Sequence, residues 1–239
     1  MPSAYPGGPS HKAGTPIYVA TVARDLGGLT TGFITASPAA LALSAARSAA
    51  EEGERLRPQI AYEPVSASPH GPGYTVTHAT TPVLYDFFEA GFVAVTLSYL
   101  ALEAFANWVI ADRLSGKIHL QRHKKVVGWD ADDAQRHATL DEKIREVLPT
   151  LTGITAPART LLDRLDNLNR VRDDTVHLNG RDAYPRSEEP LTGYFHRLLA
   201  LDLRTFPRTS VDVMLHFTPE KEQPGWLTGA DNLTARIAG

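Results

Sequence analysis

The chain of 239 residues contains no cysteine, which excludes disulfide bonds and thiolate ligands for a metal. The chain also has no large excess of charge of either sign, since it contains 24 lysines and arginines and 27 aspartates and glutamates. A formal net charge of −3 differs from that of a basic protein that coats nucleic acid, so binding to a polyanion needs a local basic patch. The lack of cysteine fits a reducing compartment, and we expect a cytoplasmic protein.

Targeting and membrane segments are not indicated either. The N-terminus lacks a cationic start followed by an apolar run, so we expect no signal peptide. The apolar run 91–111 is long enough to resemble a membrane span, but it contains Glu103 and Asn107, whose side chains are costly in hydrocarbon. We therefore predict a buried helix in this run and no contact with a membrane.

The spacing of metal-binding side chains indicates no metal site and no cofactor. His119 and His123 are four residues apart, but no carboxylate or thiol joins them nearby. A serine hydrolase has no support, because the Gly-x-Ser-x-Gly turn that presents such a nucleophile is missing. The function must therefore come from other side chains.

The N-terminal third combines turn-rich segments with short elements. Residues 1–14 are rich in proline and glycine and are predicted to be disordered. Residues 15–80 are expected to hold accessory strands and one alanine-rich helix, which begins at Ser37-Pro38 with a capping hydroxyl and a proline at its first position. The strands are expected at 17–22, 32–35 and 74–78, with a glycine turn at Gly27-Gly28, and the helix at 38–56.

Helical periodicity dominates residues 81–205. Thr81-Pro82 starts a long helix, and Thr139 with Glu142 forms a capping box three residues apart. The helices are expected at 81–113, 139–148, 157–179 (ending at Asn179-Gly180) and 187–204, with a basic loop at 117–125. Residues 206–239 are expected to hold a strand at 211–217, where apolar and polar residues alternate, and then a tail. The predicted fold is mainly α, a four- to five-helix bundle with a small sheet from the N- and C-terminal segments.

A seam of apolar and small residues runs along the long helix 81–113. Gly91 and Ser98 lie on it, and residues this small let another helix backbone approach closely. We expect this seam to mediate a homodimer.

The helix 157–179 carries a charge where its pattern calls for a leucine. Leu161, Leu165 and Leu168 follow one another at helical steps, and the next position on that stripe is Arg172. A charge on a packing face needs a partner, because an unpaired buried charge is very costly. That partner is either a carboxylate of the fold or a phosphate of a substrate.

Arg172 also opens the segment Arg-Asp-Asp-Thr-Val-His, which ends at His177 near the end of the predicted helix. A small polar residue, Asp173, follows the arginine, and an upstream helix carries Glu103 and Asn107 one turn apart. This combination resembles the HEPN superfamily (higher eukaryotes and prokaryotes nucleotide-binding domains), whose hallmark is an arginine, four to six residues and a histidine. The resemblance covers about residues 82–205.

The resemblance implies a HEPN-like helical bundle that dimerises and cleaves RNA without a metal, as a toxin or a defence effector with a cognate antitoxin or regulatory partner. In that role Arg172 holds phosphorane oxygens and His177 transfers a proton, with Asp173, Glu103 and Asn107 in support. Positions five apart on a helix differ by roughly 140° and about 7.5 Å along the axis. One helix therefore cannot close around a phosphate, which favours a composite site from two chains.

A structural alternative stays open. Arg172 pairs with Glu103 or Asp173 and His177 caps its helix in a non-catalytic dimer, which binds nucleotides or RNA or acts as a scaffold. The basic segment 113–125 offers Arg122, Lys124 and Lys125 for an RNA backbone, although charged loops are often only solvated.

Overall fold

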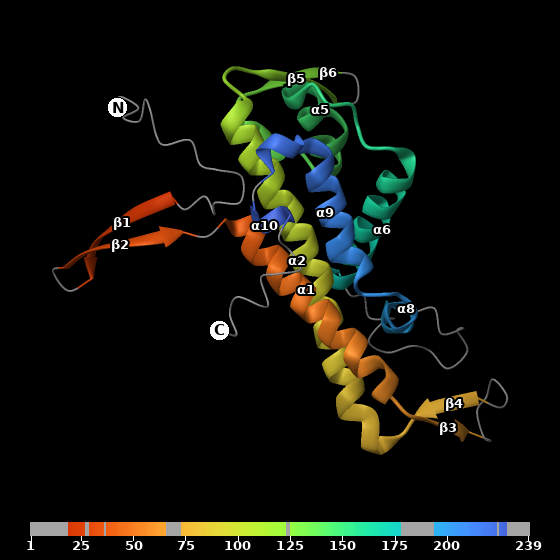
Figure 1. Ribbon diagram of the computed structural model, residues 1–239. Helices are drawn as coiled ribbons and strands as arrows, with labels where there is room; N and C mark the ends of the chain where they lie inside the picture. Colours follow the sequence, from red (N-terminus) through yellow and green to blue (C-terminus); the bar gives the residue numbers. More distant parts are fainter. Residues whose placement is uncertain are drawn as a thin grey trace.

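The computed structural model is mainly helical (Figure 1). It describes residues 19–26, 29–35, 37–65, 73–122, 125–177, 194–223 and 225–228. Several predictions lie outside these residues: the disorder of residues 1–14, the turn at Gly27-Gly28, the side chain of Lys124, the helix stop at Asn179-Gly180, and the tail beyond residue 228.

Two long helices form one side of the bundle. Helix α1 spans Pro38–Leu56, and the Ser37 hydroxyl accepts a hydrogen bond from the backbone N–H of Ala40 at 3.4 Å. Helix α2 spans Thr81–Arg113 and has Pro82 in its first turn. Helix α1 begins with its predicted cap, whereas the N-cap of α2 is Thr80, one residue before the predicted Thr81, and makes no side-chain capping bond. Helix α1 packs along α2 in Figure 1.

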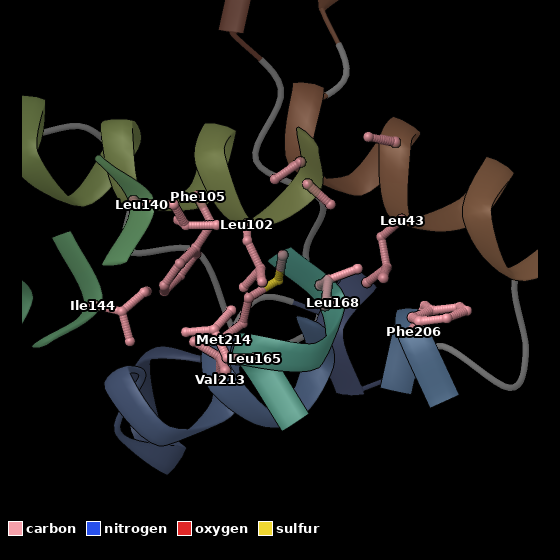
Figure 2. Packing of buried hydrophobic residues seen from close by; sticks show 14 of the residues in the cluster. Leu43, Leu102, Phe105, Leu140, Ile144, Leu165, Leu168, Phe206, Val213 and Met214 are labelled. Carbon is pink, nitrogen blue, oxygen red and sulfur yellow. The ribbon is translucent and has the colours of Figure 1, made fainter. Parts of the chain in front are cut away.

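Two further helices, α6 and α9, complete the core. Helix α6 spans Arg159–Val176 and α9 spans Thr205–Phe217, and both pack against α2. Figure 2 shows leucine, phenylalanine, valine and methionine side chains from α2, α6 and α9 converging, among them Leu102, Phe105, Leu165, Leu168, Val213 and Met214. Because α1 and α9 share this core with α2 and α6, the helices inside and outside residues 81–205 form one packed unit.

Shorter helices surround the bundle. After α3 (Ala131–His137), the predicted capping box is present, with Thr139 and Glu142 bonded to each other's backbone N–H. It begins a continuous stretch made of α4 (Leu140–Glu142), a π-helical turn (Lys143–Val147) and α5 (Leu148–Thr152). Gly153 ends this stretch at φ +71°, a conformation that costs glycine little. Helix α8 spans Tyr194–Ala200, and α10 spans Gly225–Thr228.

The strands that the structure describes form three separate antiparallel hairpins. Strand β1 (Val19–Leu26) pairs with β2 (Leu29–Thr35), β3 (Tyr62–Val65) with β4 (Gly73–Val76), and β5 (Ile118–Arg122) with β6 (Lys125–Trp129). The predicted sheet joining the N- and C-terminal segments is therefore wrong for the described residues. The basic segment 117–125, predicted as a loop, lies in the β5–β6 hairpin, where Ile118 and Leu120 are buried on one face.

The strand predicted at 211–217 is also wrong, because these residues belong to helix α9. Over seven residues, the alternation of Val211, Val213 and Leu215 mimics a half-buried strand. The buried side chains show the longer helical period instead, and they include Phe206, Ser210, Val213, Met214 and Phe217. Pro207 is tolerated because the first turn of a helix has no intrahelical use for its N–H.

The small-residue seam of α2 is covered within the chain. A Cβ atom on Gly91 would lie 2.8 Å from Cδ2 of Leu198, so α8 occupies this position. The Ser210 hydroxyl of α9 donates to the carbonyl oxygen of Ser98 at 2.9 Å. The seam therefore serves packing inside one chain, and a dimer needs a different surface.

The helical stretch His78–Arg113 is long and apolar enough, by length and composition alone, to cross a membrane. Half of its most apolar window is buried inside the protein. Helices α1, α6 and α9 pack on α2, and a core helix of a soluble protein passes the same test.

Candidate functional site: the C-terminal end of α6

Helix α6 presents Arg172 at the edge of its packing face. The buried side chains are Leu162, Leu165, Leu168 and Val171, which follow one another at steps of three. Val171 thus takes the buried position that the leucine spacing assigns to Arg172, and the Arg172 side chain is 31% exposed. The arginine therefore borders the core and still reaches solvent.

The guanidinium of Arg172 has two contacts of different kinds. Its Cζ atom lies 4.2 Å from the ring centroid of Tyr99 on α2, and its Nη1 donates to Oδ1 of Asp173 at 2.7 Å. Of the two predicted carboxylate partners, the structure shows Asp173, whose side chain is 62% exposed. Burial raises the pKa of the Tyr99 phenol, the charge on Glu103 raises it further, and the Arg172 cation opposes both. Tyr99 therefore stays neutral beside a charged arginine and two carboxylates.

His177 ends helix α6 as the capping alternative expects. Its backbone N–H donates to the carbonyl oxygen of Asp173 at 2.8 Å, and its side chain is exposed. Within the described part of the chain, the imidazole has no hydrogen-bond partner. Arg172 and His177 leave the helix in directions roughly 140° apart. One chain therefore presents both groups at the surface without joining them around a single point.

Glu103 and Asn107, predicted as supporting residues, serve a buried lysine. The Lys143 ammonium, on the π-helical turn, is fully buried and pairs with the Glu103 carboxylate. It also donates to Oδ1 of Asn107 at 2.8 Å and to the carbonyl oxygen of Gln135 at 2.9 Å. Glu103 thus contacts Lys143 directly, and it acts on Tyr99 only through its charge.

The sequence indicates that Lys143 is buried, although its residue type alone does not. After the capping box, Leu140, Ile144 and Val147 mark the buried face of a helix, and Lys143 lies on that face. A lysine on a buried face needs acceptors, because an unpaired ammonium there is costly. Glu103 and Asn107, one turn apart on α2, supply them.

The basic candidates for RNA contact differ in how much of their charge is available. Arg122 makes a two-point ion pair with Glu142, from Nε at 2.7 Å and from Nη2 at 2.6 Å, and its guanidinium lies 4.6 Å from the Trp129 ring centroid. The Arg122 hydrogen bond holds the pKa of Glu142 at about 2. Lys125 is exposed at the start of β6. A phosphate would have to displace Glu142 from Arg122, whereas Lys125 is accessible.

Two other polar features lie on α6. The side-chain oxygen of Asn169, one turn before Arg172 and Asp173, is buried and has no hydrogen-bond partner in the described structure. Between α6 and α8, a cavity of about 200 Å³ has an apolar wall that includes Val171 and Leu198 and carries Arg170 and Arg197 among its lining residues. In the described ranges, no three histidine, aspartate or glutamate side chains are grouped to hold a metal ion.

No protein-family model, curated protein or solved structure matches this chain. The HEPN resemblance therefore stays an expectation carried by Arg172, Asp173 and His177. The coarser prediction of a mainly helical bundle is confirmed. Chemically, the end of α6 offers a partly exposed cation with a fixed orientation and an exposed imidazole, which suit a phosphate and a proton transfer respectively.

Proposed function

We propose that this protein is a metal-independent endoribonuclease of HEPN type that acts as a dimer. The observation that carries the proposal is the exposure of Arg172 and His177 in the last two turns of α6. Asp173, the carboxylate paired with Arg172, is itself largely in solvent, and such an exposed pair is weak enough for a phosphate to compete for the guanidinium. The site is therefore open to an anionic substrate.

The chemistry is cleavage of RNA by its own 2′-hydroxyl. The 2′-oxygen forms a bond to phosphorus, its proton leaves to a base, and the bond from phosphorus to the 5′-oxygen breaks as that oxygen takes up a proton. Histidine exchanges protons near neutral pH, which suits His177 to one of these transfers. The planar guanidinium of Arg172 matches two phosphorane oxygens at once. The products are a 2′,3′-cyclic phosphate and a 5′-hydroxyl.

A second copy is needed because Arg172 and His177 of one chain diverge. Exposed apolar side chains support a surface for it on α2, at Val93, Leu100 and Trp108, which share one helical face through steps of seven and eight. Leu100 directly follows Tyr99, whose ring contacts the Arg172 guanidinium. Val176 is exposed one turn after Arg172. Packing two such faces together would bring Arg172 of both copies toward one cleft.

The test is an RNA cleavage assay with purified protein in excess chelator. We expect cleavage to persist in EDTA and to leave 2′,3′-cyclic phosphate ends, detected by mass spectrometry. Arg172→Ala and His177→Ala should abolish cleavage, and Arg172→Lys should restore little of it, because lysine lacks the planar fork. Arg159→Ala, at the other end of α6 and paired with Asp163, is the matched control and should cleave normally. Loss of activity in EDTA with rescue by a divalent ion would contradict this mechanism.

Thermal melts on the same variants separate catalysis from a scaffold role. Arg172→Ala loses an exposed ion pair and a ring contact, so the free energy of unfolding should fall by about 1–2 kcal/mol. A non-catalytic dimer that depends on Arg172 for packing would lose about 3–5 kcal/mol, as when a buried pair is broken. A large loss of stability together with an inactive wild type would favour the scaffold alternative.

A further inference from the structure

Tyr99 is placed to control the orientation of Arg172. The side chain of an arginine at the end of a surface helix has several rotatable bonds, and its rotamer freedom amounts to about 2 kcal/mol. In this structure the guanidinium lies over the Tyr99 ring, with Cζ 4.2 Å from the ring centroid. Tyr99 is itself anchored, because its neighbour Ser98 is fully buried and bonded to α9. The backbone at Tyr99 is therefore held on the core helix, and the ring itself is partly buried against the core.

The contacts of Arg172 leave part of its hydrogen-bonding capacity unused. A guanidinium has five N–H donors. Nη1 donates to Asp173, Cζ lies over the Tyr99 ring, and no other partner of Arg172 occurs among the described residues. The remaining donors lie on a side chain that is partly exposed. Together the two contacts fix the group without saturating it.

We propose that Tyr99 is a positioning residue that holds the Arg172 guanidinium over its ring, so that the donors not used by Asp173 stay directed toward a phosphodiester. This inference rests on the proposed nuclease function and adds a residue on a different helix to its site. It requires an aromatic ring at position 99 and does not require the hydroxyl.

The contact can be tested without any activity. In protein labelled with ¹³Cζ-tyrosine, the Tyr99 signal is the one that disappears in Tyr99→Phe. Because the Arg172 cation lowers the Tyr99 pKa, Arg172→Ala should raise that pKa further and move the signal. A Tyr99 signal that titrates identically with and without Arg172 overturns the contact.

The positioning role is tested by cleavage kinetics. We expect Tyr99→Phe to stay within about twofold of the wild type and Tyr99→Leu to lose about tenfold, or 1.4 kcal/mol, in kcat with little change in KM. Tyr85→Leu, an exposed tyrosine on the same helix, is the matched control and should leave both constants unchanged. Equal losses in the Phe and Leu variants, or a loss confined to KM, overturn the positioning role. If the wild type cleaves no RNA, the nuclease proposal fails, and the tyrosine signal alone decides whether the ring holds Arg172.

Discussion

Replacing Lys143 with methionine should be among the most damaging single substitutions in this fold. The Lys143 side chain is fully buried, and its ammonium donates to Glu103, to Asn107 and to the carbonyl oxygen of Gln135. Methionine has nearly the same length and fills the same space, so the packing term changes little. The substitution therefore isolates the loss of one charge and three hydrogen bonds.

The expected loss of stability depends on the Glu103 carboxylate, which the substitution leaves without its partner. Removing one partner of a buried ion pair costs about 3–5 kcal/mol. The Glu103 side chain is 26% exposed, so water screens part of the charge that the substitution leaves unpaired. The loss of stability should therefore lie at the lower end of this range. We expect a loss of about 3 kcal/mol in the free energy of unfolding. For a chain of this size, each kcal/mol shifts Tm by about 2–4 °C, which predicts a decrease of about 6–12 °C.

The assay is urea unfolding followed by circular dichroism, with Lys125→Met as a control at an exposed lysine. In the double variant Lys143→Met/Glu103→Leu, the orphaned carboxylate is gone, so much of the stability should return. A Lys143→Met protein within about 1 kcal/mol of the wild type would refute the argument. Additive effects of the two substitutions would refute the pairing.

Two further predictions use the hairpin β5–β6 and the exposed face of α2. Because the folded-state pKa of Glu142 is lowered from 4.5 to about 2, its pair with Arg122 stabilises the fold above about pH 4.5 and loses that effect as the pH falls toward 2. Thermal melts of Glu142→Gln should therefore depend less on pH in this window, with a difference of about 1–2 kcal/mol after allowance for solvent screening; an unchanged dependence would contradict the pair. Trp108→Glu should convert a dimer to a monomer in sedimentation without unfolding it, since the side chain is exposed; a wild type that is monomeric at micromolar concentration would remove this surface from consideration.

The starts of the long helices could be predicted because their signals are local. The Ser37 cap and the capping box of Thr139 and Glu142 act within one turn of the chain, and both are present in the structure. Thr81-Pro82 marks the start of α2 to within one residue, because the N-cap is Thr80. Helix α6 ends at Val176, before the predicted stop at Asn179-Gly180, and the segment predicted as a strand at 211–217 is part of helix α9. In α9 a seven-residue window shows strand periodicity, and only the buried residues from Phe206 onward reveal the helix.

The use of the α2 seam could not be predicted, because small residues permit a close neighbour without specifying it. Gly91 and Ser98 could equally well receive a second copy or another part of the same chain. In the structure, Leu198 on α8 packs against Gly91, and Ser210 on α9 bonds to the backbone of Ser98. Both residues are distant from the seam in sequence. The exposed row at Val93, Leu100 and Trp108 is then what remains for a partner.

The candidate site shows the same division between residue type and residue environment. Spacing alone does not single out Arg172 and His177, because Arg113 with His119 and Arg170 with His177 are similarly separated. The position late in an amphipathic helix and the polar Asp173 after the arginine add the rest of the signal. A helical step of three residues rotates the side chain by about 300°, so the stripe from Leu162 to Val171 drifts around α6 and brings Arg172 to its edge. Whether Arg172 can bind a substrate at that edge depends on the side chains of the neighbouring helix. The ring of Tyr99 occupies that position, so the chemistry we propose for Arg172 depends on a contact that spacing within α6 cannot specify.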